Sequence, residues 1–154
     1  MTPRRLNPPH YFLAALLATL VLSWLPGPGL LPGPWRFVGI VFVVAGIALA
    51  LMAARQFAAA GTNIVPLTPS SALVTRGAFA CTRNPMYLGL VLTLLGVACT
   101  VNRPWPWVVL PVFVAVIQLR FVRHEERLME ATFGDAYTAY RSRVPRWLGY
   151  IKNF

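Results

Sequence analysis

Acidic residues are scarce in this sequence, which has four carboxylate side chains against fourteen lysines and arginines in 154 residues. All four acids fall in one stretch, RFVRHEERLMEATFGD at 120–135. Charged residues make up 12% of the chain, about half of what a soluble domain carries, and this favours a membrane protein. Cysteine is also rare. Cys81 and Cys99 have no metal-ligand spacing and lie in different settings, so we expect neither a metal site nor a disulfide.

The basic residues do not indicate a nucleic-acid-binding protein, although the net charge is +10. They separate long apolar runs and do not form one solvated basic face, which is what nucleic acid requires. Lysine occurs once, at Lys152, and the other basic residues are arginine. This bias is typical of a GC-rich bacterial genome and so favours a bacterial inner membrane.

Four apolar runs predict an all-α integral membrane fold with four transmembrane helices, at about residues 10–26, 36–55, 86–101 and 105–121. The last two runs are shorter than the roughly 20 residues of a full span, so we expect a short hairpin. The first run follows a basic leader, as in a signal peptide, but no cleavage site follows it. We therefore expect one membrane domain over residues 1–154, with an uncleaved first span.

The basic residues are distributed unevenly between the two sides of this predicted topology. Twelve fall on the side of the termini, and only Arg36 and Arg103 fall on the other side. The positive-inside rule then places both termini, the loop 56–85 and a helical tail 122–154 in the cytoplasm. The loop and the acidic tail are expected to meet there, at the ends of the third and fourth spans.

The acidic stretch sorts into faces when it is drawn as a helix. Glu126 and Glu130 flank a basic face, where arginines three or four residues away are within reach of them. Glu125 points to the apolar side, where a lone carboxylate is costly unless it is paired or used. A solvated helix end with local ion pairs explains the stretch as well as a site does. The basic face consists of Arg120, Arg123, His124 and Arg127.

The loop ends in LVTRGAFACTRNPMYLG at 73–89. Asn84 and Pro85 are typical of the cap and first turn of a helix. Such a helix start directs free N–H groups and a positive dipole end to the cytosol, and Arg83 adds a cation, so a carboxylate fits there. A plain capped helix with an arginine reaching the interface explains the same residues.

Together, loop and tail resemble the isoprenylcysteine carboxyl methyltransferases and the phospholipid N-methyltransferases, which share one membrane-embedded core. The resemblance covers about residues 73–146. Asn84 stands where the carboxyl methyltransferases have histidine, and Asn-Pro-Met-Tyr is closer to the phospholipid enzymes. Arg-Val-Pro at 143–145 is closer to the carboxyl methyltransferases. The matching residues are Leu73, Val74, Thr75, Gly77, Arg83, Pro85, Tyr87, Gly89, Glu125, Glu126, Phe133, Gly134, Tyr137, Tyr140, Arg143, Val144 and Pro145.

The resemblance implies a methyltransferase that uses S-adenosylmethionine and acts on the carboxylate or amine of a lipid-like acceptor, such as an isoprenylcysteine-type compound or a phospholipid. It implies a catalytic Arg120 that grips an acceptor carboxylate or phosphate, and a Glu125 that takes a proton from an amine acceptor. The residues expected to hold the cofactor are Arg83, Asn84, Pro85, Tyr87, Leu88, Glu125 and Glu126.

Four tail residues are expected to fold over the pocket as a lid or to anchor the tail at the membrane interface, namely Tyr137, Tyr140, Arg143 and Arg146. Membrane lipids are the expected partners, and the oligomeric state stays open. Two other classes of function fit parts of the pattern. One is a non-catalytic membrane scaffold of the same fold, and the other is a basic protein that binds anionic lipid.

Overall fold

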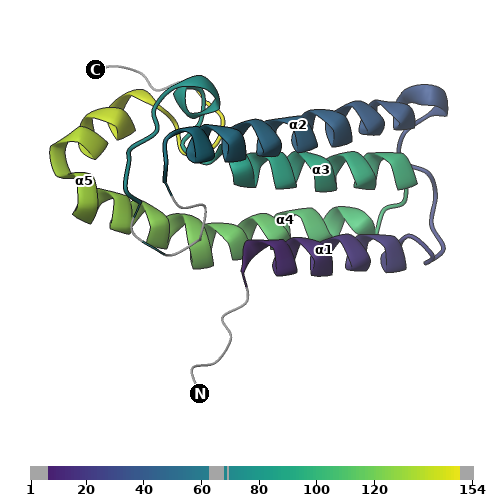
Figure 1. Ribbon diagram of the computed structural model, residues 1–154. Coiled ribbons are helices and arrows are strands. Elements are labelled where there is room, and N and C mark those ends of the chain that lie inside the picture. The colour runs from purple at the N-terminus through teal and green to yellow at the C-terminus, as the bar shows by residue number, and fades with distance from the viewer. Residues whose placement is uncertain (1–6, 63–67, 69, 150–154) are drawn as a thin grey trace.

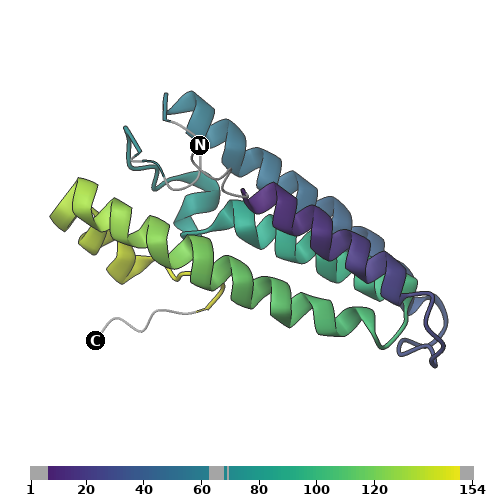
Figure 2. The same cartoon turned by 90° about the horizontal axis from the view of Figure 1, so that it is seen from below.

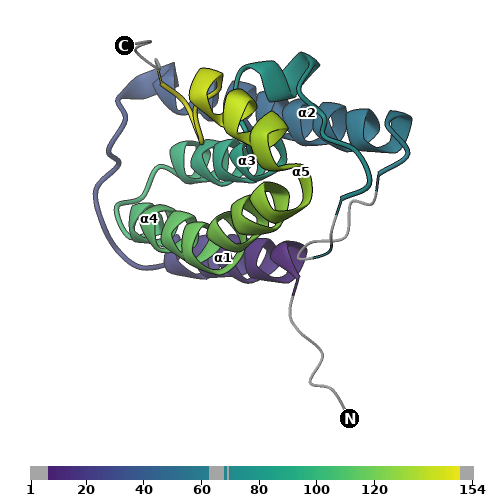
Figure 3. The same cartoon turned by 90° about the vertical axis from the view of Figure 1, so that its left-hand side faces the viewer.

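The computed structural model describes residues 7–62, 68 and 70–149, and these residues form helices and connecting loops without a strand. Helices α2 and α3 form one antiparallel pair, and α1 and α4 form a second pair below it (Figures 1 and 3). The helices are α1 (Pro8–Leu22), α2 (Val38–Ala59), α3 (Pro85–Val101), α4 (Pro106–Ile117) and α5 (Arg123–Arg143), with short turns η1 (Gly33–Phe37), η2 (Gly77–Ala80) and η3 (Gln118–Val122).

Small residues at a spacing of seven hold α2 against α3. The buried residues of α2 are Gly39, Gly46 and Ala53. A Cβ atom on Gly46 would lie 2.5 Å from the carbonyl oxygen of Gly89, and a Cβ atom on Gly39 would collide with the carbonyl oxygen of Gly96. The backbones therefore touch along the seam, as small residues allow between membrane helices. A seven-residue repeat keeps one seam facing its partner over several turns.

Helix α3 is the central helix of the bundle, because it packs against α1, α2 and α4. Side chains of α3, α4 and the turn that follows α4 make the main apolar core. Aromatic side chains of α1 complete it, with Tyr11 edge-on to Phe121 and Phe12 edge-on to Phe113. The buried members are Tyr87, Leu94, Phe113, Ile117, Phe121 and Val122.

Asn102 joins the two connections at one end of the bundle, namely the turn between α3 and α4 and the loop between α1 and α2. This residue ends α3 in the left-handed region, with φ 52°. Its side-chain oxygen accepts hydrogen bonds from the backbone N–H groups of Leu30 and Leu31, at 2.9 and 2.7 Å. The turn between α3 and α4 thus fixes the loop that joins α1 to α2. The loop before α3 and helix α5 lie at the opposite end of the bundle (Figure 1).

One helical run leads from α4 through the π-helical turn η3 into α5, as Figure 2 shows from below. The sequence predicted a span that ends near residue 121, but the helix continues without a break. It bends only at Gly134, whose φ of 50° is strained for residues with a Cβ atom. After this bend the chain folds back over the end of the bundle, and the end of α5 and the residues that follow it are thereby brought to the loop before α3.

Two helical segments, Gly33–Ala59 and Pro106–Arg143, are long and apolar enough to cross a membrane. The other two predicted spans form apolar helices of 15 and 17 residues, so the structure supports two of the four predicted spans by length. Large apolar side chains on the outer faces of α1, α2 and α4 are exposed, and such a surface is typical of contact with lipid. Examples are Leu17, Val21, Val41, Val44, Val108 and Val112.

Candidate functional site

A cavity of about 340 Å³ lies where the loop before α3 meets α5. Its size is within the range of small-molecule sites. Both sequence motifs contribute to its wall, which confirms the expectation that loop and tail meet. The expected residues in the lining are Arg83, Asn84, Pro85, Tyr87, Glu125, Glu126, Tyr137 and Tyr140.

The first polar contact in the cavity joins α3 to α5. The hydroxyl group of Tyr87 donates a hydrogen bond of 2.7 Å to Oε1 of Glu125. Tyr87 is buried and Glu125 is half-buried. The tyrosine therefore fixes one oxygen of the Glu125 carboxylate at the cavity wall. The arrangement leaves a fixed negative charge in the cavity wall.

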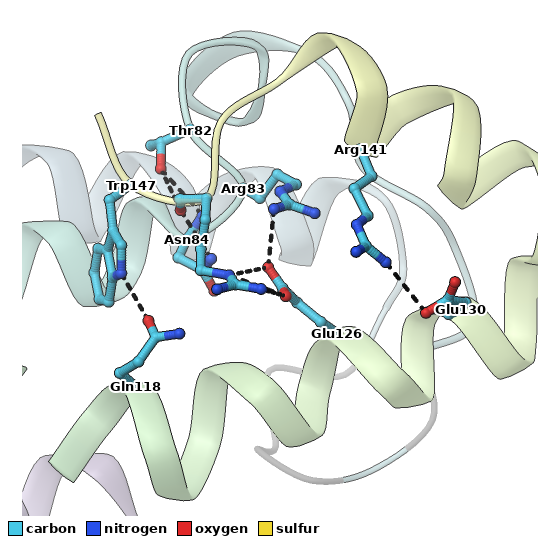
Figure 4. Close-up of polar contacts among 9 residues, drawn as sticks. Thr82, Arg83, Asn84, Gln118, Glu126, Glu130, Arg141 and Trp147 are labelled. Atoms are coloured by element: carbon cyan, nitrogen blue, oxygen red, sulfur yellow. Dashed lines mark hydrogen bonds and ion pairs between the residues drawn. The ribbon is translucent and has the colours of Figure 1, made fainter. Parts of the chain in front are cut away.

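The second polar contact is an ion-pair cluster around Glu126 (Figure 4). Nη2 of Arg83 lies 3.3 Å from Oε1 of Glu126. Arg146 donates from Nε to both carboxylate oxygens, at 2.9 and 3.0 Å, and from Nη2 to Oε2 at 2.6 Å. These hydrogen bonds to Glu126 raise the pKa of Arg146 above its usual value. Two guanidinium groups from distant parts of the chain thus share one buried carboxylate.

The sequence left local ion pairs with nearby arginines as one of two explanations of the acidic stretch, but Glu126 and Glu130 pair with arginines more distant in the chain. Glu126 pairs with Arg83 and Arg146, and Glu130 pairs with Arg141 at 3.4 Å. The two-pronged contact of a buried carboxylate is stronger than an exposed pair along one helix face. The sequence also placed Glu126 beside the basic face of the helix and Glu125 on the apolar side. In the structure Glu126 is nevertheless the more buried of the two.

The segment that follows α5, residues 144–149, is hydrogen-bonded to the loop before α3, and we call this segment the strap. The backbone N–H of Arg83 donates to the carbonyl oxygen of Pro145 at 2.9 Å. The carbonyl oxygen of Arg146 accepts hydrogen bonds from Oγ1 of Thr82 at 3.1 Å and from Nδ2 of Asn84 at 2.9 Å (Figure 4). Asn84 does stand at the cap position of α3, but its side chain does not cap the helix. The predicted capping contact is replaced by this bond to the strap.

Tyr137 and Tyr140 lie on the last turns of α5, and both are buried against the cavity. The hydroxyl group of Tyr140 donates a 2.7 Å hydrogen bond to the carbonyl oxygen of Phe79 in η2. Tyr137, Tyr140 and Val144 form a second small apolar cluster with Leu73, Met129 and Phe133 around it. This end of α5 is therefore packed down onto the loop and closes one side of the cavity.

Arg83 carries the feature that points to a ligand. Its side chain is 9% exposed, and its Nε and Nη1 atoms are buried without a hydrogen-bond partner. A buried donor without a partner costs about 1–3 kcal/mol, so such groups call for an explanation. These two N–H groups lie on opposite edges of the guanidinium plane, and a carboxylate or phosphate bound in the cavity would accept from one of them. The donor set therefore fits the anionic end of the predicted cofactor.

Four of the expected site residues lie outside the lining of the cavity. Leu88 is buried on α3. Arg120 is exposed, and its Nη1 donates to the hydroxyl of Tyr11 at 3.0 Å. Arg143 is exposed and donates from Nε to the carbonyl oxygen of Ala139 in its own helix. Arg146 reaches the site only through Glu126. Their predicted roles at the acceptor or as a lid stay predictions.

Sequence reasoning missed a large part of the cavity wall. The start of α1 and one face of α2 contribute to it, because the bundle brings these apolar segments beside the loop. No local pattern in the sequence marks them. Phe57 and Phe79 make one edge-on aromatic contact there, with ring centroids 4.9 Å apart. The missed residues are Asn7, Pro8, Pro9, Ala50, Phe57, Thr68, Ser70, Val74, Phe79, Met86, Leu90, Leu128 and Met129.

Comparison with known proteins relates most of this chain to one family. The sequence profile of the phospholipid methyltransferase family matches residues 35–136, which include α2, α3, α4 and most of α5. An uncharacterised protein of Haemophilus influenzae is 36% identical over 63 residues, which are 41% of this chain and the whole of that protein.

Proposed function

Because this chain belongs to the phospholipid methyltransferase family, we propose that it is an integral membrane methyltransferase that uses S-adenosylmethionine and methylates the polar group of a lipid-like acceptor. The observation that carries the proposal is the pair of buried nitrogens of Arg83 without a partner, in a cavity lined by both motifs. Each of these donors can bind a carboxylate, which the cofactor possesses. The family match supports the reaction type.

The proposed topology has four helices that enter the membrane, with α1 and α3 as its shorter members. Apolar outer faces of α1, α2 and α4 support this arrangement. The excess of arginine on the side of the loop and tail supports a cytoplasmic position for the cavity. The cofactor then enters from the cytoplasm, and the acceptor enters between helices from the lipid.

Cofactor binding is assigned to groups of opposite charge in one cavity. Arg83 and the uncapped start of α3 hold the carboxylate of S-adenosylmethionine. Glu125, fixed by Tyr87, offsets the positive charge of its ammonium and sulfonium groups. When bound, the cofactor supplies an activated methyl group. The protein's own contribution is to align the acceptor with that methyl group and to exclude water, and Tyr137 and Tyr140 close the wall for this purpose.

The acceptor proposed is an amine or carboxylate on a membrane amphiphile, such as a phospholipid or an isoprenylcysteine-type compound. A carboxylate reacts without a base. A protonated amine must first lose a proton, and Glu125 is the half-buried carboxylate in the cavity that can receive it. Arg120, at the end of α4, is the proposed contact for an acceptor phosphate or carboxylate that reaches the site from the lipid.

Two measurements test the proposal. Purified protein in detergent should be stabilised against heat by S-adenosylhomocysteine, because a ligand that binds only the folded state raises its stability. Incubation with labelled methyl donor and extracted membrane lipids should then label one lipid species, identified by its mass. Absence of stabilisation together with absence of a labelled lipid would contradict the proposal and leave a scaffold or a lipid-binding protein.

A further inference from the structure

Arg146 makes all the hydrogen bonds that are shorter than 3.3 Å to the carboxylate of Glu126. Both of its oxygens accept hydrogen bonds from Arg146, at 2.6–3.0 Å. The contact with Arg83 is a longer ion pair at 3.3 Å through Nη2 alone. Glu126 therefore orients Arg83 by one nitrogen but does not occupy the rest of its guanidinium group, and Nε and Nη1 remain without partners.

The charges of this cluster explain why a second arginine is needed. Arg83 and Glu126 alone would be a neutral pair, and the planar fork of an arginine matches a single carboxylate in a two-pronged contact. Such a contact would consume the donors of Arg83 and cancel its charge. With Arg146 present, two cations share one anion and the cluster keeps a net charge of +1 in a buried site.

We infer that Arg146 is a positioning residue that neutralises Glu126 and thereby keeps Arg83 free to bind the carboxylate of the cofactor. This inference rests on the proposed function and assigns Arg146 and Glu126 an indirect role through Arg83. It differs from the role expected from the sequence, in which Glu126 touches the cofactor and Arg146 belongs to a lid.

The backbone supports this assignment, because the residues that form the anion site also hold Arg146 in place. Thr82 and Asn84 bind its carbonyl oxygen through their side chains. The backbone N–H of Arg83 binds the carbonyl oxygen of Pro145 at 2.9 Å. The side chain of Arg146 is 37% exposed, against 9% for that of Arg83. Arg146 thus covers the outer side of Glu126, and Arg83 faces the cavity.

The test compares two ligands that differ in the group under discussion. S-adenosylhomocysteine carries the carboxylate together with the α-ammonium group, and 5′-deoxy-5′-methylthioadenosine keeps the nucleoside and sulfur but lacks both groups. Dissociation constants for both are measured by calorimetry on the full chain in lipid nanodiscs. Arg146→Gln is expected to weaken S-adenosylhomocysteine about tenfold, and to change the affinity for the second ligand less than about twofold. A matched control is Arg127→Gln, which removes the same charge from an exposed side chain of α5.

Two further variants keep the inference falsifiable where Arg146→Gln fails to fold. Arg146→Lys retains the charge and should retain most of the preference for S-adenosylhomocysteine. In the double variant Glu126→Gln, Arg146→Gln, the anion that would capture Arg83 is gone, so affinity for S-adenosylhomocysteine should recover relative to the single variant. A purely structural role of Arg146 predicts no such recovery.

The outcomes separate this inference from the proposed function. Equal weakening of both ligands by Arg146→Gln, unchanged binding of both, or a loss of the preference in Arg146→Lys would overturn the role of Arg146. Binding of neither ligand by the unaltered protein would overturn the proposed function itself.

Discussion

Replacement of Arg83 by methionine should leave the free protein as stable as before or make it more stable. The same replacement should weaken the stabilisation of the protein by its ligand. In the free protein, the substitution removes two buried donors without partners, each costing about 1–3 kcal/mol. Glu126 does not become an isolated buried charge, because Arg146 keeps both of its oxygens bound. Replacing a buried charge by an apolar side chain of similar length is then neutral or stabilising.

The same substitution should nearly abolish the effect of S-adenosylhomocysteine. Loss of one charge-assisted hydrogen bond worth about 3 kcal/mol raises the dissociation constant roughly a hundredfold. At a ligand concentration of 100 times the original dissociation constant, the stabilisation should fall from about 2.7 to about 0.4 kcal/mol. A ligand that binds elsewhere would stabilise the variant as much as the parent.

The assay is the midpoint of thermal unfolding in detergent, followed by tryptophan fluorescence with and without S-adenosylhomocysteine. Arg141→Met is the control, because Arg141 has an exposed ion pair with Glu130 on the same helix. A lower midpoint for ligand-free Arg83→Met, with an undiminished ligand shift, would refute the assignment of Arg83 to an anion site. Loss of stability in both conditions would show that Arg83 is mainly structural.

Three further substitutions test other parts of the molecule. Tyr87→Phe removes the donor to Glu125 and should slow methyl transfer about tenfold or more, whereas an unchanged turnover number would remove this contact from the mechanism. Gly46→Val adds side-chain atoms where 2.5 Å is available, so it should cost about 1–3 kcal/mol or more and lower the unfolding midpoint, while Ile47→Val on the exposed face should not. Arg120→Lys keeps the charge but loses the fork, so a raised KM for the lipid with unchanged affinity for S-adenosylhomocysteine is expected; unchanged kinetics would place Arg120 outside the acceptor site.

The meeting of loop and tail was predictable from the sequence, because charge placement and apolar runs carry that information. Arg83, Tyr87, Glu125 and Glu126 line one cavity, as their motifs and the predicted topology indicated. Pairing within the site was not predictable. Glu126 has arginines nearby on its own helix, and only the folded chain shows that Arg83 and Arg146 reach it instead.

Helix packing could have been inferred further than it was. Glycines recur seven residues apart in both apolar runs, at Gly39 and Gly46 and again at Gly89 and Gly96. This repeat marks the seam between α2 and α3. The bend at Gly134 and the π-helical turn before α5 are harder to predict, because each depends on long-range contacts of the tail and not on a local pattern.

The glycine seam also bears on the site, because it sets where α3 begins relative to α2. Backbone contact at Gly46 and Gly89 lies one half-turn beyond Tyr87, so the cavity wall is built on the most closely packed part of the bundle. Helix α2 then contributes Ala50 and Phe57 to the same wall. A site that must align two reactants benefits from such rigid support. The opposite wall is formed by α5, and both α5 and the strap that follows it attach to α3 through polar contacts. Any movement that admits a cofactor is therefore expected in α5 and the strap, and the α2–α3 pair should stay fixed.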